Sequence, residues 1–179
     1  MAATVFLTGT IAKEENTYEL RLSTFQCESR KKIARVTSEA RGKAAWLPTV
    51  RAQASLVNQK PAQALELLES VKPYEPGQLI GNLSYSCMIP VYLRGEAYLA
   101  TKLGAQALGE FQKLSESRGV VGNCWSGALA ILGQARARAV AGSTSAARNS
   151  YQRLFDLWKT ADADIPILQS ARREFARLK

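Results

Sequence analysis

A spacing of 12 residues between small side chains recurs three times in this chain of 179 residues. The pairs at this spacing are Ala52 and Ala64, Gly95 and Ala107, and Ala135 and Ala147. Two antiparallel helices approach closely where each carries a small residue at the crossing point. The spacing therefore predicts three helical hairpins, which follow one another at intervals of 43 and 40 residues.

Composition also favours helices, because the chain contains 27 Ala and 21 Leu residues but only 8% aromatic residues. We expect an all-α superhelix whose three hairpin units span about 46–72, 88–116 and 125–158. The individual helices are expected at 46–59, 61–72, 88–102, 104–116, 125–141 and 144–158, with breaks at 72–77 and 117–123, where Gly or Pro residues gather.

A last helix is expected at about 166–178, with Asp164 as its N-cap and Pro166 in its first turn. Its apolar residues form one stripe, which suits a helix that caps the end of a repeat array. Pro61 is expected to open a helix, and Gly142 to end one in the left-handed region. Four aromatic residues are expected in the core between helices: Trp125, Phe155, Trp158 and Phe175.

The first 45 residues carry none of the repeat markers and form a separate segment. Residues 26–45 contain helix formers without clear periodicity, and residues 6–11 have the composition of a short strand. We expect a leader that is disordered or partly helical, followed by the helical repeat domain over 46–179.

The chain contains no histidine, which excludes Ser-His-Asp and Cys-His catalytic systems and histidine-ligated zinc. Asp162 and Asp164 are explained by helix capping. We therefore expect no enzyme activity, no cofactor and no metal site. Three widely spaced cysteines indicate neither a disulfide framework nor a zinc site, and we expect small buried or surface thiols at Cys27, Cys87 and Cys124.

The net charge is +9, from 24 basic and 15 acidic residues. Such a charge permits attraction to nucleic acid or to an anionic surface. The C-terminal third is rich in arginine, and a solvated basic surface is the simpler interpretation of Arg136, Arg138, Arg148, Arg153, Arg172, Arg173 and Arg177. The sequence has no apolar run of about 18 residues and no signal-peptide pattern, so we expect no membrane span and a cytoplasmic location.

The marker residues of the second and third units resemble the tetratricopeptide repeat (TPR), a helical hairpin of 34 residues. A more specific resemblance is to the C-terminal repeat region of bacterial eukaryotic-type serine/threonine kinases, over about 46–179. It is carried by the segments 46–52, 71–75, 92–100, 110–114, 150–159 and 161–168. The kinase domain itself is absent, since the chain has no glycine-rich phosphate loop and no Asp-Phe-Gly.

The TPR resemblance implies a concave groove, lined by the first helix of each hairpin, that binds a peptide or a partner helix. The implied groove residues are Trp46, Thr49, Gln53, Tyr92, Glu96, Leu99, Leu132, Arg136 and Ala139. These residues lack the Lys and Asn pattern that clamps a C-terminal carboxylate. We expect a noncatalytic protein-interaction scaffold, a remnant or separated docking region of such a kinase. The alternatives are a basic repeat that binds nucleic acid or an anionic surface, and a decayed kinase tail without independent function.

Overall fold

The computed structural model describes residues 5–14, 17–26, 32–39, 46–75 and 87–178. The chain divides into two compact units, Met1–Leu47 and Pro48–Lys179. This division lies two residues from the boundary expected from the sequence. Each unit is described by itself below.

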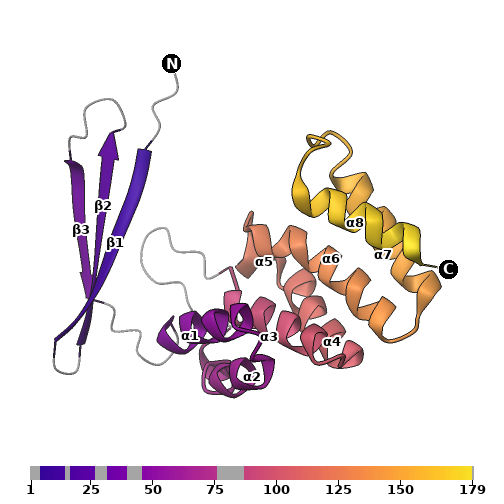
Figure 1. The fold of residues 1–179 in the computed structure, drawn as a ribbon, viewed down its shortest axis with the longest axis horizontal. Coiled ribbons are helices and arrows are strands. Elements are labelled where there is room, and N and C mark those ends of the chain that lie inside the picture. Colours follow the sequence, from indigo (N-terminus) through magenta and orange to yellow (C-terminus); the bar gives the residue numbers. More distant parts are fainter. Residues whose placement is uncertain (1–4, 15–16, 27–31, 40–45, 76–86, 179) are drawn as a thin grey trace. The chain divides into compact units, whose positions relative to one another are not determined.

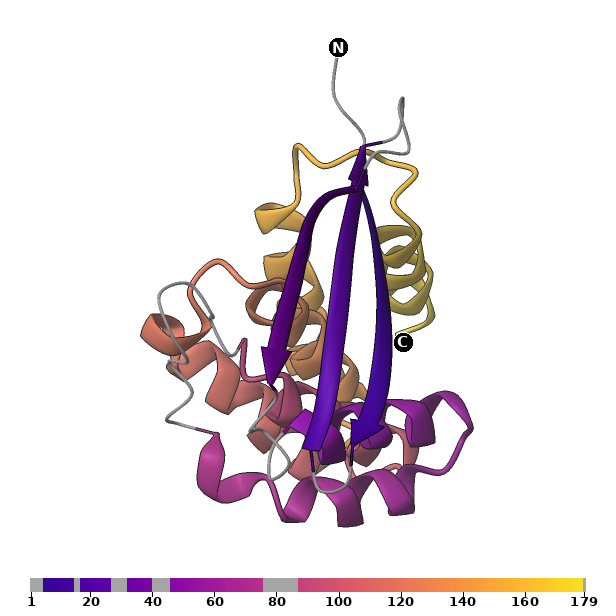
Figure 2. The same ribbon diagram turned by 90° about the vertical axis from the view of Figure 1, so that its left-hand side faces the viewer.

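The first unit contains an antiparallel sheet of three strands in the order β1-β2-β3 (Figure 2). The strands are β1 (Val5–Glu14), β2 (Thr17–Gln26) and β3 (Lys32–Glu39). Leu22 of β2 pairs with Gly9 on one side and with Val36 on the other. The expected short strand lies within β1, whereas the expectation of partly helical structure is wrong for the described residues of this segment.

The described part of the second unit is helical, which confirms the all-α class for residues 46–75 and 87–178 (Figure 1). Seven of its helices match the expected ones to within three residues at each end. They are α1 (Trp46–Val57), α2 (Pro61–Glu69), α3 (Ile89–Ala100), α4 (Gly104–Glu116), α6 (Trp125–Val140), α7 (Thr144–Leu157) and α8 (Pro166–Arg177). Two short helices, η1 (Lys72–Tyr74) and α5 (Arg118–Val121), lie in the two expected breaks.

The helix ends follow the expected turn chemistry at two of three positions. Pro61 is the first residue of α2, and Gly142 has a φ of +77° just after α6. There the amide of Ser143 donates to the carbonyl of Arg138 and closes the end of the helix. The N-cap of α8, however, is Ile165 and not Asp164, because Pro166 occupies the first helical position and holds the preceding residue outside the helix.

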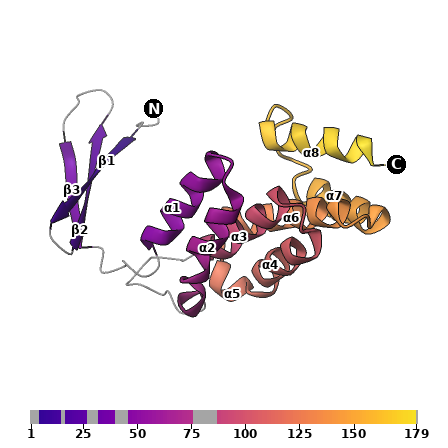
Figure 3. The ribbon, with the colours of Figure 1, turned by 60° about the horizontal axis from the view of Figure 1, so that its bottom comes forward.

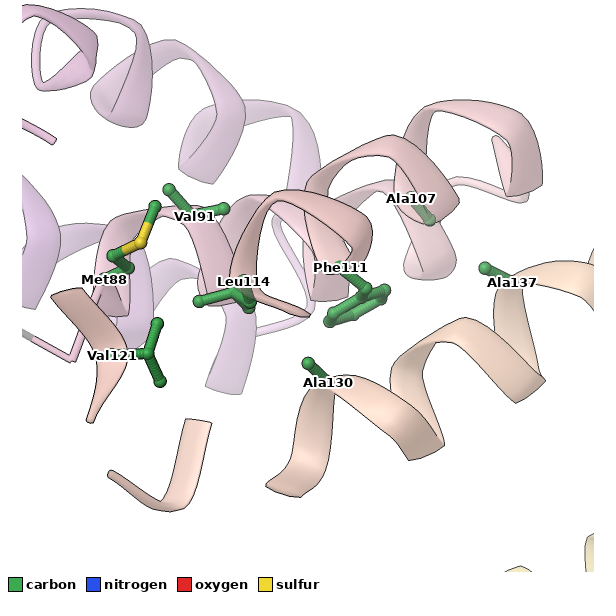
Figure 4. Packing of buried hydrophobic residues seen from close by; sticks show 8 residues of the cluster. All are labelled: Met88, Val91, Ala107, Phe111, Leu114, Val121, Ala130 and Ala137. Carbon is green, nitrogen blue, oxygen red and sulfur yellow. The ribbon is translucent and has the colours of Figure 1, made fainter. Parts of the chain in front are cut away.

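Phe111 of α4 is the central residue of the largest core cluster (Figure 4). A Cβ atom added at Gly95 of α3 would lie 2.7 Å from the Phe111 ring, and one added at Gly133 of α6 would lie 2.5 Å from it. The ring therefore fills the space that these two glycines leave, and it joins α4 to both neighbours. The remaining buried members of this cluster are Met88, Val91, Ala107, Leu114, Val121, Ala130 and Ala137.

Helix α8 packs its apolar stripe against the last hairpin, formed by α6 and α7 (Figure 3). Ala171 is fully buried there beside Leu132 and Tyr151. Phe155, Trp158 and Phe175 pack against the same cluster, as expected. Trp125 differs, because it begins α6 with 49% of its surface exposed, so its assignment to the core is wrong.

A buried ion-pair cluster ties α3 to α2 and α4. Arg94 is only 1% exposed, and its guanidinium pairs with Glu75 and, at 3.0 Å, with Glu110. It also donates a hydrogen bond to the carbonyl of Leu68 at the end of α2, and Lys113 pairs with Glu110. Because a buried arginine needs partners for its charge, these contacts fix three helices around one side chain.

Cys87 and Cys124 form a disulfide with a Cα–Cα distance of 5.4 Å, which corrects the expectation that both cysteines are thiols. Cys87 precedes α3 by two residues, and Cys124 is the N-cap of α6. The hydroxyl of Ser126 in α6 also donates to the carbonyl of Cys87. The beginnings of α3 and α6 are thus joined covalently and by a hydrogen bond. Cys27 lies outside the described residues.

No helix among the described residues has the length and apolar character needed to cross a membrane.

Substitution Gly133→Ala is expected to destabilise the helical unit, because the new Cβ would overlap the Phe111 ring and force it to move. The loss should be about 1–3 kcal/mol in urea unfolding followed by circular dichroism. Gly109→Ala in α4 is the matched control, since nothing lies within 4 Å of the added Cβ. That substitution should stabilise the unit by up to about 1 kcal/mol through helix propensity. Equal effects of the two changes would contradict the central role of Phe111.

Removal of the disulfide by Cys87→Ser with Cys124→Ser is expected to destabilise the unit by about 3–4 kcal/mol, given the sequence separation of 37 residues. A thermal melt with and without a reducing agent measures this effect. The reductant should lower the Tm of the wild type and leave the double variant unchanged. An unchanged wild-type Tm would mean that the two sulfurs are not bonded.

Candidate functional site

The structure separates the nine implied groove residues into accessible and inaccessible ones. Thr49 and Leu132 are buried, at 4% and 2% exposure, so they belong to the core and are wrong as ligand-facing positions. Leu99 packs against the Phe111 cluster, and Ala139 is half-buried. Trp46 and Gln53 are exposed on α1. Tyr92, Glu96 and Arg136 are the three that the structure brings together.

These three residues and Trp125, which contacts Tyr92, are together called the α3–α6 face. Tyr92 and Glu96 lie one turn apart on α3, whereas Trp125 and Arg136 come from α6. The charge of Arg136 acts on both Tyr92 and Glu96, so the basic side chain of α6 is close to both residues of α3. The disulfide joins the beginnings of these two helices, and the Phe111 ring packs against both of them.

The aromatic part of the face is a pair of rings in edge-to-face contact. The centroids of Tyr92 and Trp125 lie 5.0 Å apart, with planes at 81°. The other side of Tyr92 contacts Phe111 at 5.7 Å, so the core supports the pair. Edge-to-face packing is favourable between aromatic rings, and it leaves half of the Trp125 surface available for contact.

The ionic part of the face is joined to the capping helix through Glu174 of α8. Nε and an Nη of Arg136 donate to the two carboxylate oxygens of Glu174, at 2.9 and 2.8 Å. The hydroxyls of Tyr151 and Ser170 donate to the same carboxylate, at 2.8 and 2.9 Å. Burial acts to raise the pKa of Glu174, but these hydrogen bonds and the Arg136 charge outweigh it, and its pKa is lowered.

The pKa of Glu96, in contrast to that of Glu174, is raised in the fold. The Oε1 atom of Glu96 is buried and has no hydrogen-bond partner among the described residues. Burial raises the pKa of Glu96 above its usual range, and the negative charge of Glu174 raises it further. The Arg136 charge and an interaction with the Tyr92 hydroxyl lower the pKa, but they offset the rise only in part. Burial and Glu96 together also raise the pKa of Tyr92, so that hydroxyl stays protonated at neutral pH. Two nitrogens of Arg136 are bonded to Glu174, whereas Oε1 of Glu96 has no hydrogen-bond partner among the described residues.

The chemistry of the face is suited to binding. It offers two aromatic rings, one incompletely paired carboxylate and one neutralised guanidinium. Among the described residues, no group of three or more His, Cys, Asp or Glu residues is placed to hold a metal ion. Asp162 and Asp164 are exposed in the turn before α8.

The exposure of Trp125 and the pairing of Glu174 with Arg136 were not predicted from the sequence. Glu174 carries a usable signal, because it lies three residues after Ala171 on the apolar stripe of α8. A single acidic residue on a buried stripe requires a partner. Trp125 had no such signal, since a tryptophan at the start of an apolar helix is typical of a core residue.

The C-terminal arginines divide into paired and exposed residues. Arg138 donates to Ser150 and Gln134, and Arg148 lies 4.3 Å from the centroid of the Phe175 ring. Arg148 also donates to the carbonyl of Leu178, which ties α7 to the end of α8. Exposed positions on α7 and α8 are occupied by Arg153, Arg172, Arg173 and Arg177.

In comparisons with known proteins, no protein-family model matches the chain, and no curated protein matches it significantly.

Substitution Glu96→Gln is expected to stabilise the helical unit at pH 8, because it removes an incompletely paired buried charge. The gain should be about 1–3 kcal/mol in urea unfolding. A carboxyl whose folded pKa is raised contributes stability below its unfolded pKa of about 4.3 and loses that stability as pH rises through the folded pKa. The gain should therefore shrink towards zero as the pH falls to about 4. A gain that did not depend on pH would mean that Glu96 is not ionised in the fold.

Glu174→Gln is the matched change with the opposite sign. The pKa of Glu174 is lowered in the fold, so its stabilising effect is complete above about pH 4.3 and disappears as pH falls through the folded pKa. The substitution should cost about 1–2 kcal/mol at pH 7 and less in acid, measured by the same urea titrations. A variant that loses nothing at pH 7 would contradict the role of Glu174 in holding α8.

Proposed function

We propose that the helical unit is a noncatalytic interaction scaffold that binds a partner peptide or helix on the α3–α6 face. The proposal rests on the interaction of Arg136 with both Tyr92 and Glu96. It also rests on the contact of Tyr92 with Trp125, which is half-exposed. Aromatic residues and arginine contribute most of the binding energy in many protein interfaces. Here they lie on helices that are fixed by a disulfide and a tightly packed core, which lowers the entropic cost of binding.

We further propose that the unit is a TPR-like superhelix related to the C-terminal region of bacterial serine/threonine kinases. The support comes from the segments of sequence that resemble that family and from three successive helix pairs, α1/α2, α3/α4 and α6/α7, followed by α8. The DNA sequence upstream of the Met1 codon tests this relationship. A reading frame with kinase motifs there supports a separated docking region, whereas an unrelated gene argues against it.

The binding proposal is tested by selecting displayed random peptides of 12 residues on the immobilised full chain in its oxidised form. Recovered peptides should bind in isothermal titration calorimetry. Their Kd should rise about tenfold or more for Trp125→Ala, because an exposed aromatic anchor is lost.

Leu157→Ala on α7 is the control for that experiment, since Leu157 is also apolar and 56% exposed. It should leave the Kd unchanged. Failure to recover any binding peptide, or equal losses for the two variants, would overturn the assignment of the face.

The alternative function, binding of nucleic acid or an anionic surface, has its support in the exposed arginines of α7 and α8 and the net charge of +9. Fluorescence anisotropy with a labelled DNA duplex at 50 and 200 mM salt distinguishes it. Counterion release makes such binding fall steeply with salt, whereas binding at an aromatic face changes little. Tight DNA binding at 50 mM salt that weakens steeply at 200 mM salt would favour this alternative over a peptide scaffold.

A further inference from the structure

Among the described residues, three buried side-chain atoms have no hydrogen-bond partner: Arg94 Nε, Glu110 Oε2 and Glu96 Oε1. The first two lie 3.0 Å from each other in the ion-pair cluster, so their charges satisfy one another. Glu96 Oε1 has no such neighbour. Buried polar groups in proteins are almost always paired, and an exception requires an explanation.

The charges around Glu96 do not supply the missing partner. Arg136 has the nearest positive charge, but two of its nitrogens donate to both carboxylate oxygens of Glu174. When Glu96 is ionised, the side chains of Glu96, Arg136 and Glu174 together carry two negative charges and one positive charge. This part of the protein is thus locally acidic, although the whole chain has a net charge of +9.

The neighbouring rings favour the same kind of ligand. Tyr92 and Glu96 lie one turn apart on α3 and interact electrostatically, and Trp125 and Tyr92 are in edge-to-face contact. The face of an aromatic ring attracts a cation within about 6 Å, and tryptophan does so most strongly. A carboxylate without a full set of partners and two rings are the groups that hold an ammonium or guanidinium ion.

We propose that the α3–α6 face binds the side chain of a lysine or arginine in the partner peptide, with Glu96 as its counter-ion and Trp125 and Tyr92 as its aromatic contacts. This inference rests on the proposed function and names its ligand. The Glu96 side chain is partly exposed, whereas its Oε1 atom is buried, so binding requires the carboxylate to rotate towards the incoming cation. The incoming cation supplies the hydrogen-bond partner that Oε1 of Glu96 lacks.

The test compares peptides selected by display on the wild-type full chain with those selected on the Glu96→Gln variant. Wild-type binders should be enriched in lysine and arginine relative to the starting library, and binders of the variant should not. In calorimetric titration, the Kd of a wild-type binder should rise about tenfold or more with Glu96→Gln, since a hydrogen-bonded ion pair is lost.

Two controls separate this loss from general effects. Glu66→Gln changes an exposed carboxylate on α2 and should leave the Kd unchanged. Replacement of the peptide's basic residue by methionine should weaken binding to the wild type by the same factor as Glu96→Gln, and it leaves the protein unaltered. Because Glu96→Gln is expected to raise the stability of the unit, a loss of binding in that variant cannot come from unfolding.

The outcomes are distinct. Peptides that bind at the Trp125 face without a basic residue, or that keep their affinity for Glu96→Gln, would overturn this inference and leave the scaffold proposal intact. A library that yields no binder at all would overturn both. Basic peptides that lose affinity equally with Glu66→Gln would show a nonspecific charge effect and would also overturn the inference.

Discussion

The position of one ring, that of Phe111, determines how α3, α4 and α6 lie together. The ring occupies the space left by two missing side chains, at Gly95 and at Gly133, on helices that are far apart in sequence. Interiors are packed at crystal-like density, so neither helix can move inwards and neither can accept a larger residue at that point. The Phe111 ring therefore fixes the separation of α3 and α6. This separation in turn determines the distances between the residues of the α3–α6 face.

Much of the helical unit could be predicted from the sequence because its signals are local. Small residues at a spacing of 12 mark the helix crossings, Pro61 marks a helix start, and Gly142 marks a helix end. Each depends on backbone geometry within a few residues, so no knowledge of the tertiary structure is needed. The structure brings Tyr92, Glu96 and Arg136 close together, and these three positions were named from the TPR resemblance.

The features that were missed depend on contacts between distant residues. Thr49 and Leu132 occupy positions equivalent to Tyr92, but they face the core, and only the packing of neighbouring helices shows this. Arg94 was not recognised because its partners, Glu75 and Glu110, lie on different elements. The expected strand over residues 6–11 lies within β1, but β2 and β3 were missed, because residues 26–45 contain many helix formers and strand pairing depends on distant contacts. An odd number of cysteines gave no pairing, since pairing follows from distance in space.

The bond between Cys87 and Cys124 gives the unit two covalent states that depend on its surroundings. Secreted and periplasmic proteins keep such bonds, whereas glutathione and thioredoxin reduce them in the cytosol. In a reducing compartment the beginnings of α3 and α6 would be joined by the Ser126 hydrogen bond and by packing alone. The redox state of Cys87 and Cys124 in cells would therefore report on whether this chain is held in a reducing or an oxidising compartment.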